Sequence, residues 1–262
     1  MRNVDSHSVI GKSHKVCQDY SLAITSSETV VLSDGCSSSP MTDWGSRLLC
    51  LEAAENGPEL ACSRIFGSVL PKLSLPPECL DATLLHASVM GDCVRAKMLG
   101  DGLIVGRRRG GGWVGIKSEF PSGAPRYSSY DLDPARRENY LKAFGASWVI
   151  STFMDGSLVM DERRELKNEV LLPYVVDFQI EEFDLVLLMS DGVFSFSKPD
   201  GSMGGRKGVP LEEVVSEMLQ IKGFAGEFIF RRMRKFLKDS AAAGWSHDDD
   251  FSVAGIHLGG AS

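Results

Sequence analysis

The chain of 262 residues is 43% hydrophobic and 24% charged, the ordinary composition of a globular protein. Its 28 basic and 35 acidic residues give a formal net charge of −7, which disfavours nucleic-acid binding, because affinity for a phosphate backbone rests on Lys and Arg. The longest apolar runs, such as Leu185–Met189, fall far short of the roughly 20 residues of a spanning helix. The first residues carry no apolar signal core, so we expect neither a membrane contact nor export.

Six cysteines occupy positions 17, 36, 50, 62, 79 and 93. No two of them are separated by two residues, so the common zinc and redox spacings are missing. We therefore expect reduced thiols and a cytoplasmic location. The sequence carries no signal for oligomerisation, and a monomer is the expectation.

Strand-like segments dominate the first half of the chain, with two helices among them. The predicted strands are Val30–Leu32, Ala82–Ala87, Val94–Leu99, Leu103–Val105 and Val114–Lys117. The third and fourth of these flank a Gly-Asp-Gly turn and are predicted to pair as neighbours. Helices are predicted at Asp43–Asn56 and Pro58–Leu70. The segment Glu119–Arg137, rich in Pro, Ser, Gly and Tyr, is interpreted as an extended loop or flap.

In the second half, four strands and two helices are predicted. The strands are Trp148–Phe153, Tyr174–Ile180, Leu185–Ser190 and Phe251–His257, and the helices are Leu211–Ile221 and Gly226–Ala243. The last helix is basic on one side, which we interpret as a solvated face. Strands and paired helices in this order indicate antiparallel sheets in an α+β fold, with residues 1–262 as a single domain.

The informative feature is a set of aspartates at the ends of apolar strands. Asp34 and Asp191 lie in matching Ser-Asp-Gly tripeptides, and Asp101 lies between two glycines. Asp249 belongs to an acidic triplet directly before a strand, and Asp19 precedes Tyr20 in the same way. Any one of them is explained by a turn, since Asp-Gly is a common turn dipeptide. Five together favour a site for hard divalent cations, which take oxygen ligands and offset the cost of desolvating carboxylates.

These motifs resemble those of the metal-dependent type 2C (PPM) protein phosphatases, closest to the bacterial branch. The resemblance rests on Gly11-Lys12-Ser13-His14, Cys17-Gln18-Asp19, Ser33-Asp34-Gly35, Gly100-Asp101-Gly102, Ser190-Asp191-Gly192 and Asp249-Asp250-Phe251-Ser252-Val253. Each motif alone is weak, but together they occur in the family's order over nearly the whole chain. The resemblance implies a four-layer α-β-β-α sandwich of two antiparallel sheets flanked by helix pairs.

The resemblance also implies roles for the acidic residues. Asp34 would bridge two Mn²⁺ or Mg²⁺ ions, with the Gly35 carbonyl on one of them, and Asp191 and Asp249 would bind the other ion. Asp101 would serve a possible third ion, shared with Asp191. Asp19 would hold metal-bound water, and the activated water would attack phosphorus.

Two positions depart from the family pattern. His14 stands where many members have an arginine that holds the phosphate; it either binds phosphate more weakly or makes a structural bond near the site. Cys36 stands where many eukaryotic members have a histidine, and we interpret it as a small residue packed beside the metal loop. His247, next to the acidic triplet, either extends the site or belongs to the loop.

The leading hypothesis is a metal-dependent serine/threonine protein phosphatase whose substrate is a phosphoprotein, paired with a Ser/Thr kinase. The alternative is a catalytically weak, phosphoprotein-binding regulatory module of the same fold. A third hypothesis applies the same hydrolysis to a small phosphate metabolite. The flap is expected to influence the choice of substrate.

Overall fold

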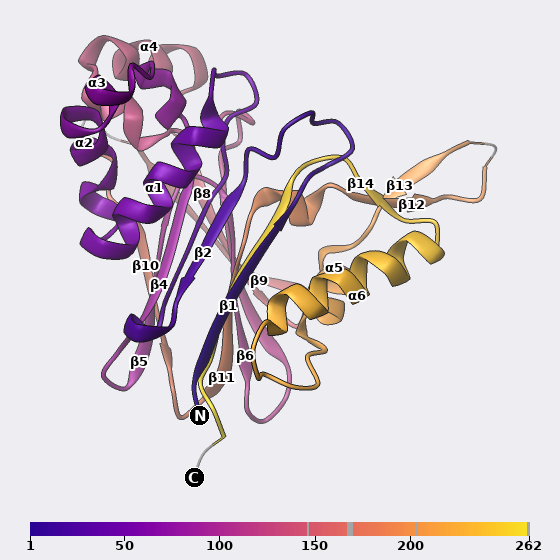
Figure 1. Ribbon diagram of the computed structural model, residues 1–262. Helices are drawn as coiled ribbons and strands as arrows, with labels where there is room; N and C mark the ends of the chain where they lie inside the picture. Colours follow the sequence, from indigo (N-terminus) through magenta and orange to yellow (C-terminus); the bar gives the residue numbers. More distant parts are fainter. Residues whose placement is uncertain (146, 167–169, 203, 261–262) are drawn as a thin grey trace.

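Two antiparallel β-sheets packed face to face form the centre of the structure, with helices on both outer sides (Figure 1). The computed structural model describes residues 1–145, 147–166, 170–202 and 204–260. The first sheet has seven strands in the order β1 (Asn3–Val9), β15 (Phe251–His257), β11 (Phe183–Met189), β6 (Gly102–Arg108), β7 (Trp113–Glu119), β8 (Ser147–Met154) and β9 (Ser157–Glu165). The second has five, in the order β10 (Tyr174–Gln179), β5 (Cys93–Leu99), β4 (Leu84–Met90), β3 (Thr29–Ser33) and β2 (Tyr20–Ile24).

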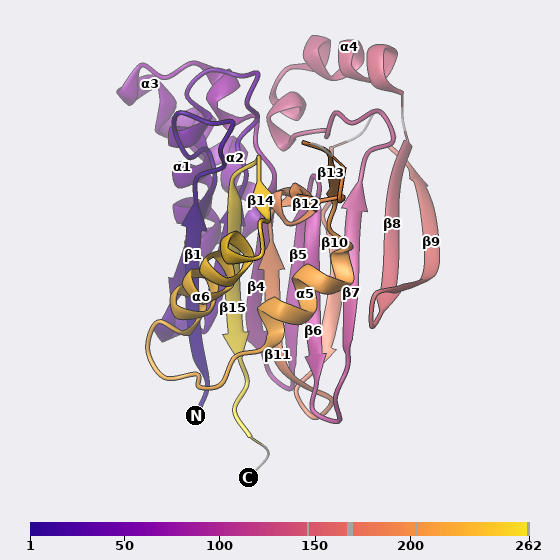
Figure 2. The same cartoon turned by 90° about the vertical axis from the view of Figure 1, so that its right-hand side faces the viewer.

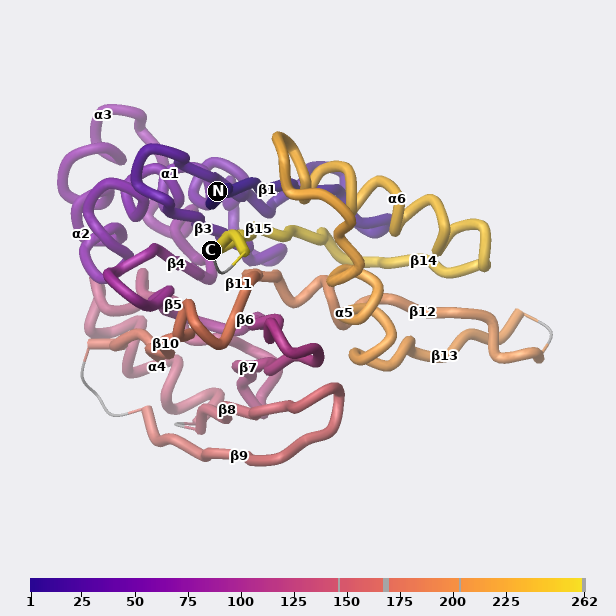
Figure 3. Tube along the Cα trace, turned by 90° about the horizontal axis from the view of Figure 1, so that it is seen from below, coloured from indigo at the N-terminus to yellow at the C-terminus, as the bar shows by residue number. Residues whose placement is uncertain are grey.

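The helices cover the outer faces of the two sheets. Helices α1 (Thr42–Asn56), α2 (Pro58–Ser68) and α3 (Leu70–Leu73) lie beside the five-stranded sheet, and α5 (Leu211–Leu219) and α6 (Phe228–Ala242) lie on the opposite side of the molecule (Figure 3). Helix α4 (Pro134–Phe144) lies near one end of the strands (Figure 2). A small third sheet contains β12 (Phe196–Pro199), β13 (Arg206–Gly208) and β14 (Ser246–His247).

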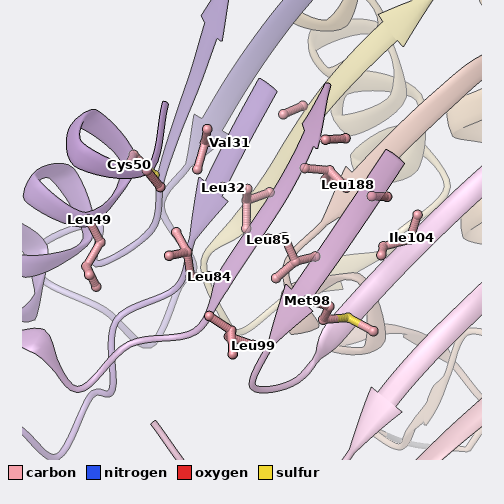
Figure 4. Close-up of a cluster of buried hydrophobic side chains, with 14 of the residues drawn as sticks. Val31, Leu32, Leu49, Cys50, Leu84, Leu85, Met98, Leu99, Ile104 and Leu188 are labelled. Carbon is pink, nitrogen blue, oxygen red and sulfur yellow. The ribbon is translucent and has the colours of Figure 1, made fainter. Parts of the chain in front are cut away.

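The central strands are apolar on both faces because each is covered twice. Leu49 and Cys50 of α1 lie on one side of the five-stranded sheet, and Ile104 and Leu188 of the seven-stranded sheet lie on the other (Figure 4). Strand β3 is buried along its whole length, which explains its run of β-branched and aliphatic residues without polar alternation. A second apolar cluster lies between the seven-stranded sheet and the α5–α6 pair.

The α+β sandwich predicted from the sequence is confirmed, and the predicted helices are present with small shifts of their ends. One strand prediction is wrong: β5 and β6 are consecutive but do not pair, since β5 belongs to the five-stranded sheet and β6 to the seven-stranded one. The turn between them therefore crosses from sheet to sheet. Gly100 makes this crossing with a φ of 94°, and a Cβ there would lie 2.9 Å from Thr83, so glycine is required.

The flap prediction is partly wrong. Residues 119–137 include a 3₁₀ turn at Ser128–Leu132 (η3) and the start of α4, which Asp133 caps through the N–H groups of Ala135 and Arg136. Strands β1 and β9 were not predicted, because their residues alternate weakly or are exposed on both faces, and the short strands β12, β13 and β14 were not predicted either. No helix within the described residues combines the length and the apolar character needed to cross a membrane.

Candidate active site

The register of β2 and β3 places two of the predicted carboxylates side by side. Tyr20, the first residue of β2, pairs with Ser33, the last residue of β3. Asp19 directly precedes the one strand and Asp34 directly follows the other, so the two side chains leave the sheet at the same point. The carboxyl groups of Asp19 and Asp34 therefore lie close together.

The seven-stranded sheet brings two more carboxylates to the same end of the sandwich. Met189 at the end of β11 pairs with Val253 near the start of β15, and the Ser190 N–H donates to the Ser252 carbonyl at 3.1 Å. Asp191 follows β11 and Asp249 precedes β15, so both lie at this end of the strand pair. This end of both strands faces the small sheet and α4 (Figure 2).

Asp101 reaches the site because its turn crosses between the sheets. The Gly100 carbonyl accepts a hydrogen bond from Ser118 Oγ at 2.6 Å, which fixes the turn against β7. On its other side the turn contacts Thr83, whose Oγ1 accepts from the Asp34 N–H at 3.2 Å. The crossing that the sequence analysis read as a hairpin therefore carries Asp101 toward Asp34.

One pocket of about 340 Å³ collects almost all of the predicted site residues. Asp34, Gly35, Asp101, Asp191 and Asp249 line it together with His14. Asp19 lies behind this lining and is only 4% exposed. No Lys or Arg is among the described residues that line the pocket, and His14 is the one basic side chain among them.

The crowding of acidic groups changes their titration. Burial, then the charges of Asp191 and Asp19, raise the pKa of Asp34 well above its ordinary value. Burial is also the main cause that raises the pKa of Asp19 to about 7 and that of Asp101 to about 8. The pKa of Asp191 is raised as well, again chiefly by burial. Without an added cation, the cluster therefore holds protons that isolated carboxyl groups would release.

His14 lines the pocket and lies between the carboxylates of Asp249 and Asp250. Its Nδ1 is 3.0 Å from Asp250 Oδ2, without the alignment of a good hydrogen bond, and its Nε2 is 3.5 Å from Asp249 Oδ1. Burial acts to lower the pKa of His14, but Asp250, then Asp249 and Asp19, outweigh it and the pKa is raised. Of the two roles left open for His14, this geometry favours the structural one.

Asp250 is an important residue that the sequence analysis did not single out. It is 2% exposed, and it accepts hydrogen bonds from the Gly11 N–H at 2.8 Å and the Gln18 N–H at 2.6 Å. These bonds tie the loop before β2, which carries His14 and Asp19, to the loop before β15. The acidic triplet was visible in the sequence, but nothing in it showed which of its members points inward.

Further pocket residues come from segments that the motifs do not cover. Cys36 and Ser38 lie at the end of the Asp34 loop, with Cys36 Sγ 3.1 Å from Ser38 Oγ, and Tyr127 and Tyr130 form part of the wall. Burial acts to raise the pKa of the Cys36 thiol, but hydrogen bonds with Ser38 and Tyr127 lower it overall. His247 is not among the lining residues; its ring packs on Phe196.

The residues present fit divalent cations. Both carboxylate oxygens of Asp19 are buried without a hydrogen-bond partner, and Ser190, Ser252 and Asp34 lie nearby. Among the described residues, no three Asp, Glu, His or Cys side chains are arranged to ligate one ion unaided. Carboxylate and carbonyl oxygens are the ligands that hard cations such as Mg²⁺ and Mn²⁺ take, and waters complete the coordination of such ions.

Comparison with known proteins places the chain by structure rather than by sequence. No protein-family profile and no curated protein sequence matches it. Among solved structures it is similar to a bacterial serine phosphatase (11% identity, TM-score 0.55, 100% of both chains). It is also similar to the serine/threonine phosphatase PstP of Mycobacterium tuberculosis (15%, 0.53, 99% of both chains) and to Stp1 of Staphylococcus aureus (13%, 0.53, 99% of this chain and 96% of that one).

The chain therefore has the fold of the bacterial PPM serine/threonine phosphatases over its full length. At these identities the likeness establishes the fold, and it confirms the resemblance drawn from the motifs at that level. The activity is argued from the site.

Proposed function

We propose that the chain is a Mn²⁺- or Mg²⁺-dependent phosphatase that hydrolyses phosphoserine and phosphothreonine in proteins. The observation that carries this proposal is the pocket lined by Asp34, Asp101, Asp191 and Asp249 with no Lys or Arg among its described residues. A phosphate ester cannot approach four carboxylates unless cations neutralise them. The acidic pocket is thus suited to phosphate only when it is loaded with metal.

Each acidic residue has a defined place in this proposal. Asp34 lies at the centre, in contact with Asp19 and Asp191, and is assigned to two ions together with the Gly35 carbonyl. Asp191 and Asp249 would hold an ion on the β11–β15 side, and Asp101 would serve a possible third ion. When bound, such cations acidify water and neutralise the charge of the phosphoryl oxygens.

Asp19 and His14 are assigned to positioning roles: Asp19 positions water, and His14 orients Asp249. Asp19, buried behind the pocket, accepts a proton or a hydrogen bond at its two unpartnered oxygens. His14 neutralises Asp249 and Asp250 from the loop that carries it, which keeps Asp249 turned toward the pocket.

The substrate class is inferred from the fold and from the pocket wall. The three solved structures named above are described as serine or serine/threonine phosphatases. Tyr127 and Tyr130 of the 119–137 segment and Phe144 of α4 border the acidic floor, which provides an apolar contact for residues flanking a phosphoserine. We assign the supply of this substrate to a protein Ser/Thr kinase.

One observation favours the regulatory alternative. His14 occupies the position of a phosphate-holding arginine, and both of its ring nitrogens face carboxylates, so the pocket offers no guanidinium to the substrate. Under the regulatory alternative, the chain binds a phosphoprotein and hydrolyses its phosphate slowly. A measured turnover rate distinguishes the two functions.

The test is hydrolysis of a phosphoserine peptide with Mn²⁺, with Mg²⁺ and in excess EDTA. We expect activity only with added metal, and a loss of kcat/KM of at least about 100-fold in Asp34→Asn, since even altering the surroundings of a metal ligand costs about 10- to 100-fold. Asp92→Asn, an exposed aspartate in the β4–β5 turn, is the matched control and retains activity. Full activity in EDTA contradicts the proposal.

A further inference from the structure

A second pocket, of about 440 Å³, lies at the junction of α5 and α6, on the outer side of the seven-stranded sheet. Its walls include Lys222, Arg231, Arg232 and Lys235, with Ile221 and Phe228 as apolar neighbours. No acidic side chain is among the described residues that line it. In a chain of net charge −7, this pocket is a local concentration of positive charge.

Arg232 is the unusual member of this set because it is buried. It is 6% exposed; its Nη2 donates to Glu217 Oε2 at 2.9 Å, but its Nε has no hydrogen-bond partner. A buried donor left unsatisfied is costly. Arg232 also lines the pocket, so an oxyanion bound there would add a counter-charge to this buried guanidinium.

The other cations are incompletely neutralised. Arg231 donates to the backbone carbonyls of Gly223 at 3.2 Å and Ala225 at 2.7 Å, which hold the guanidinium in place without cancelling its charge. Lys222 has no carboxylate partner within the described part of the chain. Lys235 Nζ donates to Asp239 Oδ2 at 2.5 Å, in an ion pair at the surface.

We propose that this pocket is an anion site, separate from the acidic one, that binds the phosphate group of inorganic phosphate or of a phosphate monoester. Arginine and lysine donors around one pocket match the several acceptor oxygens of such a group. The acidic pocket requires metal to accept phosphate, whereas the α5–α6 pocket needs none. The proposal is therefore independent of catalysis.

The experiment is calorimetric titration of the full chain with inorganic phosphate in excess EDTA, repeated with phosphoserine, at constant ionic strength. EDTA keeps the acidic pocket free of metal, and the described residues that line that pocket include no Lys or Arg to hold phosphate, so binding reports the α5–α6 pocket. The variant Lys222→Gln/Arg231→Gln removes two exposed cations without touching the Arg232–Glu217 pair. The variant Arg234→Gln/Lys238→Gln removes the same charge from α6 outside the pocket and is the control.

We expect saturable phosphate binding that the first variant weakens by at least about tenfold and the control retains. Saturable binding of phosphoserine that the first variant also weakens assigns phosphate monoesters to the pocket, and binding of inorganic phosphate without phosphoserine assigns free phosphate. The proposal is overturned if the unaltered chain shows no saturable binding, or if both variants bind alike.

Discussion

His14 lies within reach of Asp249 and Asp250, and this placement determines what its substitution should do. In His14→Gln, Asp249 loses a cationic neighbour that orients it. We expect the Mn²⁺ concentration for half-maximal activity to rise by about tenfold, while KM for a phosphopeptide at saturating Mn²⁺ changes little. Steady-state kinetics at several Mn²⁺ concentrations give both quantities.

The same kinetics distinguish the two roles of His14. If the imidazole held the phosphate group instead, KM for the phosphopeptide would rise at saturating metal and the Mn²⁺ dependence would stay unchanged. His7→Gln, a histidine that packs on Phe230, serves as the control and should leave both quantities as they are.

At the scale of elements, Asp81 connects the 119–137 segment, which includes the start of α4, to the loop that precedes α1. This buried carboxylate accepts from Ser39 at 2.8 Å, Ser129 at 2.6 Å and Arg136 at 2.8 Å, and the guanidinium also lies 4.7 Å from the centre of the Tyr130 ring. Arg136 thus fixes a segment that forms one wall of the pocket.

Arg136→Met removes this tie. We expect an unfolding free energy lower by about 2 kcal/mol, the value of a hydrogen bond to a charged group. We also expect a severalfold rise in KM for a phosphopeptide, with p-nitrophenyl phosphate hydrolysis nearly unchanged because that substrate has no flanking residues to contact the wall. Lys142→Met, which breaks only an exposed pair with Glu138 on α4, is the control. Equal losses on both substrates would count against a positioning role for the wall.

The parts of the site that follow from strand ends could be predicted from the sequence. The tripeptides around Asp34 and Asp191 end buried strands, and a strand end predicts where its next residue lies once the sheet is known. The sequence placed Asp101 among the site residues, but the path of the chain around it could not be predicted, because Gly-Asp-Gly is equally compatible with a hairpin and with a crossing between sheets. Tyr127 and Asp250 were also out of reach, since their places depend on contacts with residues far away in the chain.

For the whole molecule, the acidic cluster predicts an unusual pH dependence of stability. The pKa values of Asp19 and Asp101 are raised to about 7 and about 8, chiefly by burial. In this range the folded state binds more protons than the unfolded state, so the free energy of unfolding of the metal-free chain falls as pH rises from about 4 to about 8. Cations bind the deprotonated cluster and reverse this trend.

Thermal unfolding with Mn²⁺ and with EDTA, between pH 5.5 and 8, checks this prediction. At 100 times its dissociation constant, a ligand stabilises by about 2.7 kcal/mol, roughly 5–10 °C in a chain of this size, and the shift should be largest at pH 8. Asp101→Asn should weaken the pH dependence of the free energy of unfolding measured in EDTA. If Mn²⁺ raises the unfolding temperature by the same amount at pH 5.5 and at pH 8, protons and metal do not compete for the cluster.

The most direct measurement is anomalous diffraction from crystals of the chain grown with Mn²⁺. The account predicts two strong peaks in the acidic pocket, both next to Asp34, with one extending toward Asp191 and Asp249. A pocket that is free of anomalous density at saturating Mn²⁺ would contradict it.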